Sequence, residues 1–330
     1  MPKLYLLLDL SAALIMPRVV AQSQQPVTPQ AQSSSTTRPA NLTTQLKKTV
    51  GLLRVRYLRE DGPAEADGTC FFVFYEDKRA GENFGFMYLV TNRHMAQPGI
   101  EDGKHYQALL TTLRLNLRNG VQGSEESVVP IGEHLLHWVF PADDSVDLAV
   151  LPMLPSLERF DYVPFPLSAF ATHQLVEEQG IAEGEKILFA GYFYQFPGQK
   201  KFEPIVREGI LAMLPDEKLD TTLKKPGHLY LGDVHVFGGN SGSPLFINLG
   251  GFRNGSLLMG DQYKLLGIVS GFYHEDSNLK LTVATTLTGK LEQNSGIAMI
   301  VPADELKALL DTPALQATRD AAIAAKNSKK

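Results

Sequence analysis

Residues 237–246, FGGNSGSPLF, place a serine inside a glycine-rich turn directly ahead of an apolar run. Glycines on both sides of Ser241 allow the positive φ angles that other residues resist. Such a turn can aim the backbone amides of Gly239 and Ser241 at one point beside the serine hydroxyl. Acyl transfer requires a nucleophile and donors for a developing oxyanion. A hairpin turn with an incidental serine is the alternative, so the context of the motif decides between the two.

A serine nucleophile needs a base, and one of the 8 histidines stands in a suitable place. His94 follows the apolar, β-favouring run of residues 86–91, just past the end of an expected strand. Asp147 is the candidate for the carboxylate that orients this base, because it directly precedes a short apolar run that is typical of a buried strand. The neighbouring Asp143 and Asp144 are interpreted as solvated turn residues.

The order His94, Asp147, Ser241 resembles that of chymotrypsin-like serine proteases. Three segments resemble the histidine, aspartate and serine segments of bacterial trypsin-like peptidases of the HtrA type, namely LVTNRHMA at 89–96, VDLAVLPM at 146–153 and GGNSGSPLF at 238–246. Two more resemble the strand that lines the substrate backbone and the closing strand before a C-terminal helix, namely LGIVSG at 266–271 and SGIAMIVP at 295–302. The resemblance therefore runs through residues 68–302.

Period-two apolar patterns broken by turn residues predict many short strands, which suits a sandwich or a barrel. The predicted strands are 50–58, 68–76, 85–92, 106–117, 127–131, 146–152, 186–193, 203–214, 229–236, 243–248, 264–273, 279–286 and 296–301. The resemblance implies an all-β fold of two six-stranded antiparallel β-barrels with a short C-terminal helix. His94 and Asp147 would then come from the first barrel and Ser241 from the second. The helix is predicted to start at Pro302, a residue that suits a first helical position.

Composition supports one large domain and excludes some function classes. The chain has 330 residues, of which 44% are hydrophobic and 20% charged, and a formal net charge of −5. A chain of this length can bury a sizeable core. No basic stripe with interleaved aromatic residues is present, so we expect no nucleic-acid partner. The single cysteine, Cys70, cannot form an intramolecular disulfide, which favours a bacterial origin over that of a disulfide-rich animal protease.

The ends of the chain differ from its middle. Small residues at 19–21 follow a short apolar run, as in a secretory signal peptide cleaved after Ala21; an uncleaved anchor or a misassigned start is the alternative. We expect a secreted or periplasmic bacterial protein with no membrane span after signal removal. The predicted organisation is a signal peptide at 1–21, a disordered linker rich in Gln, Ser, Thr and Pro at 22–46, a trypsin-like serine protease domain at 47–312 and a flexible basic tail at 313–330.

The resemblance also implies roles for single residues. His94 would act as general base, Asp147 as orienting carboxylate, Ser241 as nucleophile, and the amides of Gly239 and Ser241 as oxyanion hole. Asn240 stands where zymogen-activated relatives carry the aspartate that pairs with a newly cut N-terminus. We therefore predict no zymogen cleavage.

The resemblance places the substrate pocket at six residues: His235, Ser270, Gly271, Phe272, Gly296 and Ala298. No acidic residue stands at the expected pocket floor, so a preference for Lys or Arg side chains is not predicted. His235 stands near the floor, although an exposed or packed strand histidine is an equal reading. Ser270 is expected to hydrogen-bond near Asp147.

The predicted function is that of a serine endopeptidase acting on polypeptide substrates. Catalytically silent or latent trypsin-fold binding modules have the same fold, and a non-proteolytic esterase is a further alternative. No cofactor is predicted. His134 and His137 have a metal-like spacing, but no nearby cysteine or carboxylate pair completes a site, so no metal is predicted. The sequence leaves the oligomeric state open.

Overall fold

The computed structural model describes residues 41–82, 84–119, 127–132, 136–260, 262–282 and 286–328. The predicted signal peptide, most of the predicted linker and His134 lie outside these ranges. The first element is helix α1 (Leu42–Lys47), which is capped by the Asn41 side chain and buries Leu46. The end of the segment predicted to be a disordered linker is therefore helical. A mostly polar run hid this helix, which packs against the core through its two leucines, Leu42 and Leu46.

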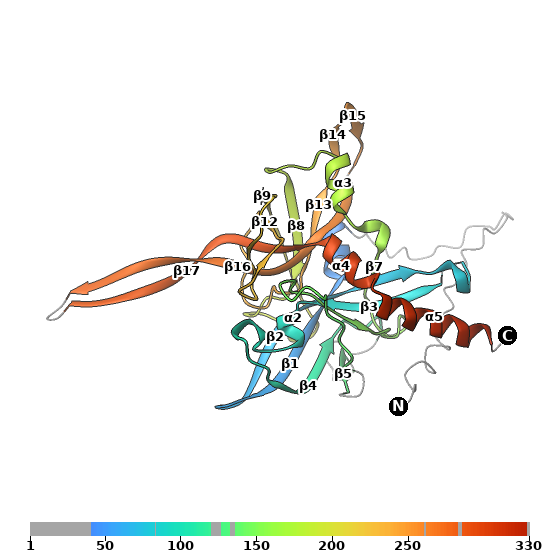
Figure 1. Ribbon diagram of the computed structural model, residues 1–330, viewed down its shortest axis with the longest axis horizontal. Helices are drawn as coiled ribbons and strands as arrows, with labels where there is room; N and C mark the ends of the chain where they lie inside the picture. The colour runs from blue at the N-terminus through green and yellow to red at the C-terminus, as the bar shows by residue number, and fades with distance from the viewer. Residues whose placement is uncertain are drawn as a thin grey trace, which may run out of the picture.

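Six antiparallel strands form the first barrel-like sheet (Figure 1). They are β1 (Val50–Arg59), β2 (Gly62–Glu76), β3 (Gly85–Thr91), β4 (Gln107–Arg114), β5 (Val128–Ile131) and β6 (Ala149–Pro152). Their order in the sheet is β5-β4-β1-β2-β3-β6, and the short β7 (Phe165–Pro166) pairs parallel to β2. Each of the first six predicted strands corresponds to one of these. The two-residue β7 was missed, since two residues show no periodicity.

The second barrel is closed, in the order β12-β17-β16-β13-β8-β9. Its strands are β8 (Lys186–Gly191), β9 (Ile205–Met213), β12 (Tyr230–Asp233), β13 (Pro244–Asn248), β16 (Tyr263–Thr282) and β17 (Thr286–Pro302). Two hairpins outside the barrel were not predicted: β10 (Leu219–Asp220) with β11 (Pro226–Gly227), and β14 (Gly251–Arg253) with β15 (Ser256–Leu258). The predicted all-β fold with a six-stranded barrel is confirmed.

Strands β16 and β17 continue past the barrel as a two-stranded arm, on the left of Figure 1. Their pairing runs from Gly267 opposite Pro302 to Thr282 opposite Thr286. The sequence had predicted three separate strands in this region. Register shifts between Val269 and Gly271, and between Phe272 and His274, interrupt the alternation of the side chains. The sequence pattern therefore breaks where the hydrogen-bonded ladder continues.

Short helices connect the strands, and two longer helices end the chain. The short ones are η2 (Lys78–Ala80), α2 (Arg93–Ala96), η3 (Ile100–Asp102), η6 (Leu167–Ala169) and α3 (His173–Glu178). The predicted C-terminal helix is α4 (Ala303–Leu310), which buries Leu306, Leu309 and Leu310. A second helix, α5 (Pro313–Asn327), occupies most of the segment predicted to be a flexible basic tail. These residues are helical in the structure, where the sequence suggested a frayed or loosely helical tail.

A buried arginine explains why α5 was missed. Leu315, Arg319 and Ile323 follow one another at four-residue intervals and form the buried face of α5. The Arg319 guanidinium lies 3.9 Å from the centre of the Tyr75 ring and donates to the Tyr88 hydroxyl at 3.0 Å. In the sequence, an arginine at the centre of this face suggests solvent exposure. The two tyrosines of the first barrel and the Leu310 carbonyl of α4 together provide its partners.

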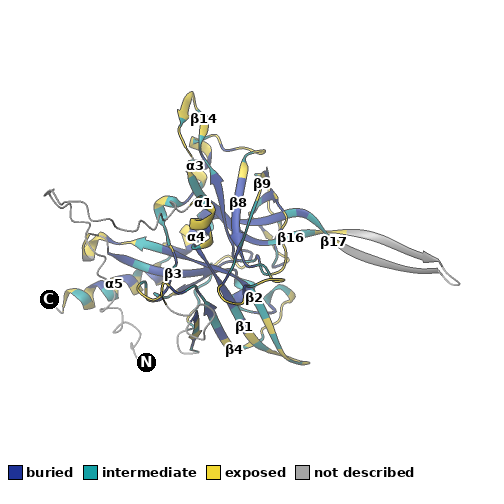
Figure 2. Cartoon of the chain, turned by 180° about the vertical axis from the view of Figure 1, so that it is seen from behind, coloured by how far each residue is buried: buried dark blue, intermediate teal, exposed yellow. Residues whose placement is uncertain are grey.

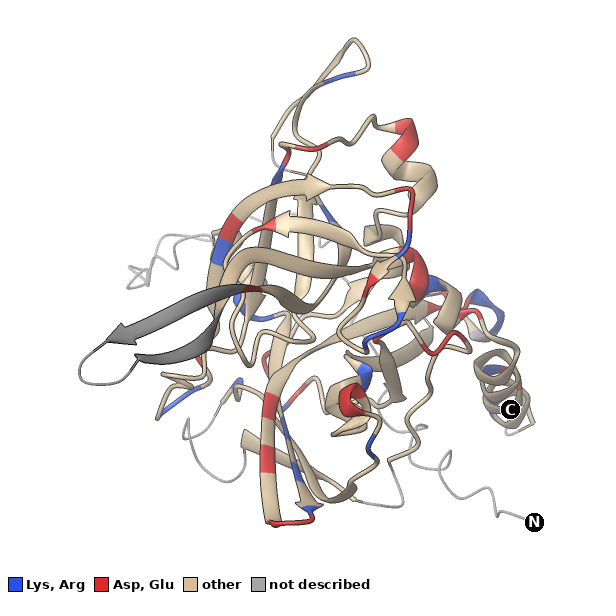
Figure 3. Cartoon of the chain, turned by 60° about the vertical axis from the view of Figure 1, so that its left-hand side comes forward, with Lys and Arg blue, Asp and Glu red and all other residues tan. Residues whose placement is uncertain are grey.

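The two barrels share one apolar cluster, which fixes how they face each other. It includes Phe71 and Leu148 of the first barrel and Phe246 and Ile268 of the second. Figure 2 shows buried segments concentrated where the strands of both barrels meet. In the view of Figure 3, acidic and basic residues are interspersed over both barrels. Within the described ranges, no helix is long and apolar enough to cross a bilayer.

Candidate active site

His94 stands where strand β3 passes into the one-turn helix α2. The residue that joins them is Asn92, whose side-chain amide donates to the Asp147 carbonyl at 2.8 Å. This bond ties the start of α2 to the segment that leads into β6. The His94 side chain is 14% exposed and the Asp147 side chain 0%. The helix therefore holds the imidazole at the rim of the buried interior, with the carboxylate behind it.

The Asp147 carboxylate accepts three hydrogen bonds. The His94 ring nitrogen Nδ1 lies 2.7 Å from Oδ2, and the His94 backbone amide donates to Oδ1 at 3.0 Å. The Ser270 hydroxyl, from the second barrel, donates to Oδ2 at 2.6 Å. A buried carboxylate costs free energy unless such donors replace water. Asp147 is therefore held in place by residues of both barrels.

These contacts set the protonation states of the pair. Burial on its own lowers the pKa of His94, but the charge of Asp147 and its hydrogen bond outweigh burial and raise that pKa above its usual value. Burial on its own raises the pKa of Asp147, but the charge of His94 and the hydrogen bonds from His94 and Ser270 lower it. Because an ionised carboxylate only accepts, Nδ1 of the neutral ring is the donor. Nε2 then carries the free lone pair and can act as a base.

Ser241 lies in a turn whose glycines adopt the left-handed region, with φ of +92° at Gly239 and +84° at Gly242. The Ser241 hydroxyl donates to the Ser270 carbonyl at 3.2 Å. In the part of the chain that the structure describes, no hydrogen bond links Ser241 to His94. Likewise, among those residues, the amides of Gly239 and Ser241 have no acceptor. Both are available to an incoming oxygen atom.

The turn is fastened to the first barrel by Thr69, which is fully buried on β2. Its amide donates to the Ser241 carbonyl at 2.8 Å, and its hydroxyl donates to the Gly239 carbonyl at 2.8 Å. The same hydroxyl accepts from the Tyr192 amide at 2.9 Å. The Asn240 side chain donates to the Tyr192 carbonyl at 2.7 Å. One threonine of the first barrel thus holds the carbonyls on both sides of Asn240.

Comparison with known proteins identifies the family of the chain. A sequence model of the trypsin-like peptidase domain matches residues 68–251, more than half of the chain. The protein belongs to the trypsin-like peptidase family. A comparison with curated proteins finds no similar sequence.

Two solved structures are similar to this peptidase. That of Deg5 is 18% identical, with coverage of 70% of this chain and 82% of the other, and a TM-score of 0.40. That of the Rv3671c protease from M. tuberculosis, in its active form, is 19% identical, with coverage of 89% and 93% and a TM-score of 0.42.

The residues predicted to line the substrate pocket of the peptidase fall into two groups. His235 is exposed, and a Cβ atom built on Gly296 would lie 3.7 Å from its ring. The His235 ring also stacks on Phe237, with ring centres 6.4 Å apart. The structure therefore brings His235 and Gly296 together beside the strand that leads to the serine turn.

The other predicted pocket residues lie on β16 and β17. Ser270 is buried and hydrogen-bonded to Asp147, as expected. Gly271 follows it, and Phe272 pairs in register with the buried Ala298 of β17. The Phe272 ring packs on His274, with ring centres 4.8 Å apart. Within the described part of the chain, the rings of Phe272 and His235 form no stacked or edge-on pair with each other.

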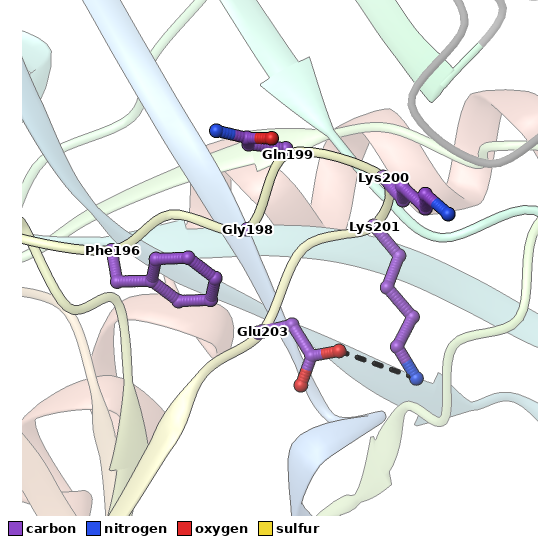
Figure 4. A pocket seen from close by; sticks show the side chains of 6 residues that line it. All are labelled: Phe196, Gly198, Gln199, Lys200, Lys201 and Glu203. Atoms are coloured by element: carbon purple, nitrogen blue, oxygen red, sulfur yellow. Dashed lines mark ion pairs between the residues drawn. The ribbon is translucent and has the colours of Figure 1, made fainter.

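A cavity of about 580 Å³ opens elsewhere on the peptidase, along residues 196–203 (Figure 4). Its lining residues are Phe196, Gly198, Gln199, Lys200, Lys201 and Glu203. None of them belongs to the predicted site, so this cavity is not the predicted substrate pocket. In the described ranges, no cluster of three His, Cys, Asp or Glu could hold a metal ion.

Sequence reasoning missed several residues that hold the site together. Thr69 reaches across the barrels to the Gly239 carbonyl, and Asn92 joins α2 to the Asp147 carbonyl within the first barrel. The Tyr192 carbonyl accepts from the Asn240 side chain within the second barrel. Thr222 was also missed, and it contacts the Ser270 hydroxyl. Only Asn92 lay within a quoted motif, LVTNRHMA at 89–96. The others are common residue types in ordinary strands and loops, and nothing in their local sequence indicates a distant partner.

Proposed function

We propose that this trypsin-like peptidase is a serine endopeptidase that hydrolyses peptide bonds through an acyl-enzyme. The observation that carries the proposal is the buried Asp147–His94 pair, at 2.7 Å, next to a serine turn with two free amides. His94 is assigned as general base, Asp147 as orienting carboxylate and Ser241 as nucleophile. These are the three functions that acyl transfer from a peptide requires.

The first step transfers a proton within the site. The Ser241 hydroxyl leaves the Ser270 carbonyl by rotation about χ1 and gives its proton to Nε2 of His94 as its oxygen attacks the substrate carbonyl. Asp147 keeps Nδ1 protonated and stabilises the imidazolium that forms. The imidazolium then gives its proton to the leaving amine, and water repeats the sequence on the acyl-enzyme. Rotation of one hydroxyl is the only rearrangement of the triad in this scheme.

The amides of Gly239 and Ser241 are assigned as oxyanion hole. Such donors are worth about 3–4 kcal/mol each in the transition state. Asn240 supports this assignment: it is buried, donates to the Tyr192 carbonyl at 2.7 Å and accepts from the Phe237 amide at 2.9 Å. Both ends of its amide are satisfied inside the fold. We therefore propose that the turn forms on folding, without cleavage of a zymogen.

A catalytically silent or latent binding module is the second candidate. The hydrogen bond from Ser241 to the Ser270 carbonyl favours it, because that bond keeps the serine proton away from His94. In this case the region around Ser241 and His94 would recognise polypeptides without cleaving them, or would need an activator to turn the hydroxyl.

Covalent labelling distinguishes the two candidates. A fluorophosphonate probe is expected to label the folded wild-type protein and to lose its target in Ser241→Ala. Ser243→Ala is the matched control, because this serine of the same turn is fully buried and its hydroxyl has no hydrogen-bond partner among the described residues. Labelling should persist in that variant. Folded wild-type protein that resists the probe would support the binding module instead, and labelling of Ser241→Ala would exclude Ser241 as nucleophile.

The substrate pocket and the location are further parts of the proposal. His235, Ser270, Gly271, Phe272, Gly296 and Ala298 are proposed to contact the substrate, with no preference for Lys or Arg. Export to the periplasm or the medium is proposed from residues 1–21, which lie outside the described ranges.

The pH dependence of hydrolysis is expected to follow His94. Below its pKa the imidazole is protonated and cannot accept the serine proton, so activity falls as the pH is lowered. Since Asp147 raises this pKa, half of the maximal kcat/KM should be reached above pH 6.5, the usual value. Initial rates of casein hydrolysis between about pH 5 and 9 test this. A rate that stays constant into strongly acidic solution would show that His94 is not the general base.

A further inference from the structure

Residues 219–227 form a loop of the second barrel that we call the bridging loop. Strands β10 and β11 close it as a short hairpin. Lys224 has a φ of +56°, and its amide donates to the Thr221 carbonyl at 2.8 Å, which makes the turn tight. Leu223 is buried and anchors the loop. The loop therefore has a defined shape, and Thr222 lies at a set position within it.

Two ion pairs connect the bridging loop to the first barrel. Lys224 lies 2.7 Å from Asp102, at the end of η3, shortly after the helix that holds His94. Lys225 pairs with Asp144, three residues before Asp147. Exposed pairs like these add little stability, but they show which surfaces the loop faces. The loop spans the two first-barrel segments that supply the base and its carboxylate.

Thr222 adds one residue to the hydrogen-bonded chain of the site. Its Oγ1 lies 2.7 Å from the Ser270 Oγ, and the Ser270 hydroxyl donates to Asp147 at 2.6 Å. Because the only proton of the Ser270 hydroxyl points at Asp147, Thr222 is the donor to Ser270. A Cβ atom on Gly271 would lie 3.0 Å from Oγ1 of Thr222, so the glycine permits this close approach. The result is a chain from Thr222 through Ser270 and Asp147 to His94.

We infer that Thr222 is a positioning residue of the active site, which orients the Ser270 hydroxyl toward Asp147 and thereby holds the His94 imidazole for proton transfer. The inference rests on the proposed function. Thr222 touches none of the reacting groups and acts only through Ser270. Without the Thr222 hydroxyl, the Ser270 hydroxyl is free to turn. The hydrogen bond that it donates to Asp147 then weakens. The carboxylate then attracts the proton of His94 more strongly.

Thr222→Val removes the hydroxyl and keeps the shape, and Thr222→Ser keeps the hydroxyl. With a peptide substrate, we expect Thr222→Val to lower kcat about two- to tenfold at unchanged KM, and Thr222→Ser to restore it. The acid limb of the pH–rate profile should move upward in Thr222→Val. Asp147 by contact and Glu101 by its charge are the groups that raise the pKa of His94. Thr222→Val leaves both residues in place, so the expected shift comes only from the weaker hydrogen bond between Ser270 and Asp147. If Thr222→Val matches the wild type in both measurements, the inference is overturned.

A double-mutant cycle tests the route through Ser270. Ser270→Ala should lower kcat more than Thr222→Val, and adding Thr222→Val to it should have no further effect. If the two effects multiply instead, Thr222 acts on its own and the inference is wrong. Thr222→Ala replaces Thr222→Val in the cycle should the valine variant fold poorly, as judged by its thermal unfolding.

A spectroscopic titration separates this inference from the proposed function. The His94 ring can be titrated by NMR in the full chain whether or not the protein turns over substrate. An upward shift of its pKa in Thr222→Val, reversed in Thr222→Ser, supports the positioning role even if the fluorophosphonate probe fails to label the protein. If the His94 titration is unchanged in Thr222→Val while the probe labels the wild-type protein, the proposed function stands and the positioning role of Thr222 is excluded.

Discussion

Replacing Asp147 with asparagine is expected to lower kcat/KM about 10⁴-fold, the size of effect seen for this change in Ser-His-Asp triads. The reason lies in which atoms face each other. Nδ1 of His94 lies 2.7 Å from Oδ2, which also receives the Ser270 hydroxyl at 2.6 Å. An amide nitrogen there would donate to Nδ1 and move the ring proton to Nε2, where the serine proton must go. The backbone bond from His94 to Oδ1, at 3.0 Å, fixes which end of the amide is the oxygen.

Asp144→Asn is the matched control for this prediction. Asp144 is 65% exposed and pairs with Lys225 at the surface. The kcat/KM of the Asp144→Asn variant should therefore stay within about threefold of the wild type. Both variants are compared in peptide hydrolysis and in circular dichroism, to verify the fold. A folded Asp147→Asn protein with nearly full activity would show that the carboxylate does not set the tautomer of His94.

Gly239→Ala is expected to lower kcat about 10²- to 10³-fold, the cost of losing one oxyanion donor. Gly239 has a φ of +92°, which an alanine adopts only with strain. A Cβ atom there would lie 2.6 Å from the Tyr192 ring. Tyr192 cannot retreat freely, because its amide is bound to Thr69 and its carbonyl to Asn240. The turn must therefore shift and take the Gly239 amide with it.

The neighbouring Gly238 offers the control. A Cβ atom on Gly238 meets nothing within 4 Å, and its φ is not positive. Gly238→Ala should therefore change kcat by less than about threefold. Single-turnover acylation with an activated ester measures the step in which the oxyanion forms. Equal losses in the two alanine variants would mean that the motif tolerates no side chain at all, and the specific role of Gly239 would be lost.

The sequence predicted the barrel strands well because each shows local alternation and ends in turn residues. It also placed His94 at a strand end and Asp147 before a buried strand, as the structure has them. It failed at α5, where the buried Arg319 depends on aromatic rings more than 200 residues away, as the separation of 231 from Tyr88 shows. It failed at the β16–β17 arm for a different reason, since bulges break the alternation of side chains without ending the ladder.

The chain by itself determined the family, the two-barrel fold and the identity of the candidate nucleophile, base and carboxylate. The strands follow from periodicity and turn chemistry, which are local properties. The family, the two barrels and the roles of the three residues follow from the resemblance of short motifs to a known family. The tertiary structure alone decided that the Ser241 hydroxyl rests on the Ser270 carbonyl and that Thr69 holds the serine turn. It also decided that Thr222 extends the hydrogen bonds behind Asp147. Such contacts join residues far apart in the chain, and a hydroxyl shows no preference for a partner until folding places one within its reach.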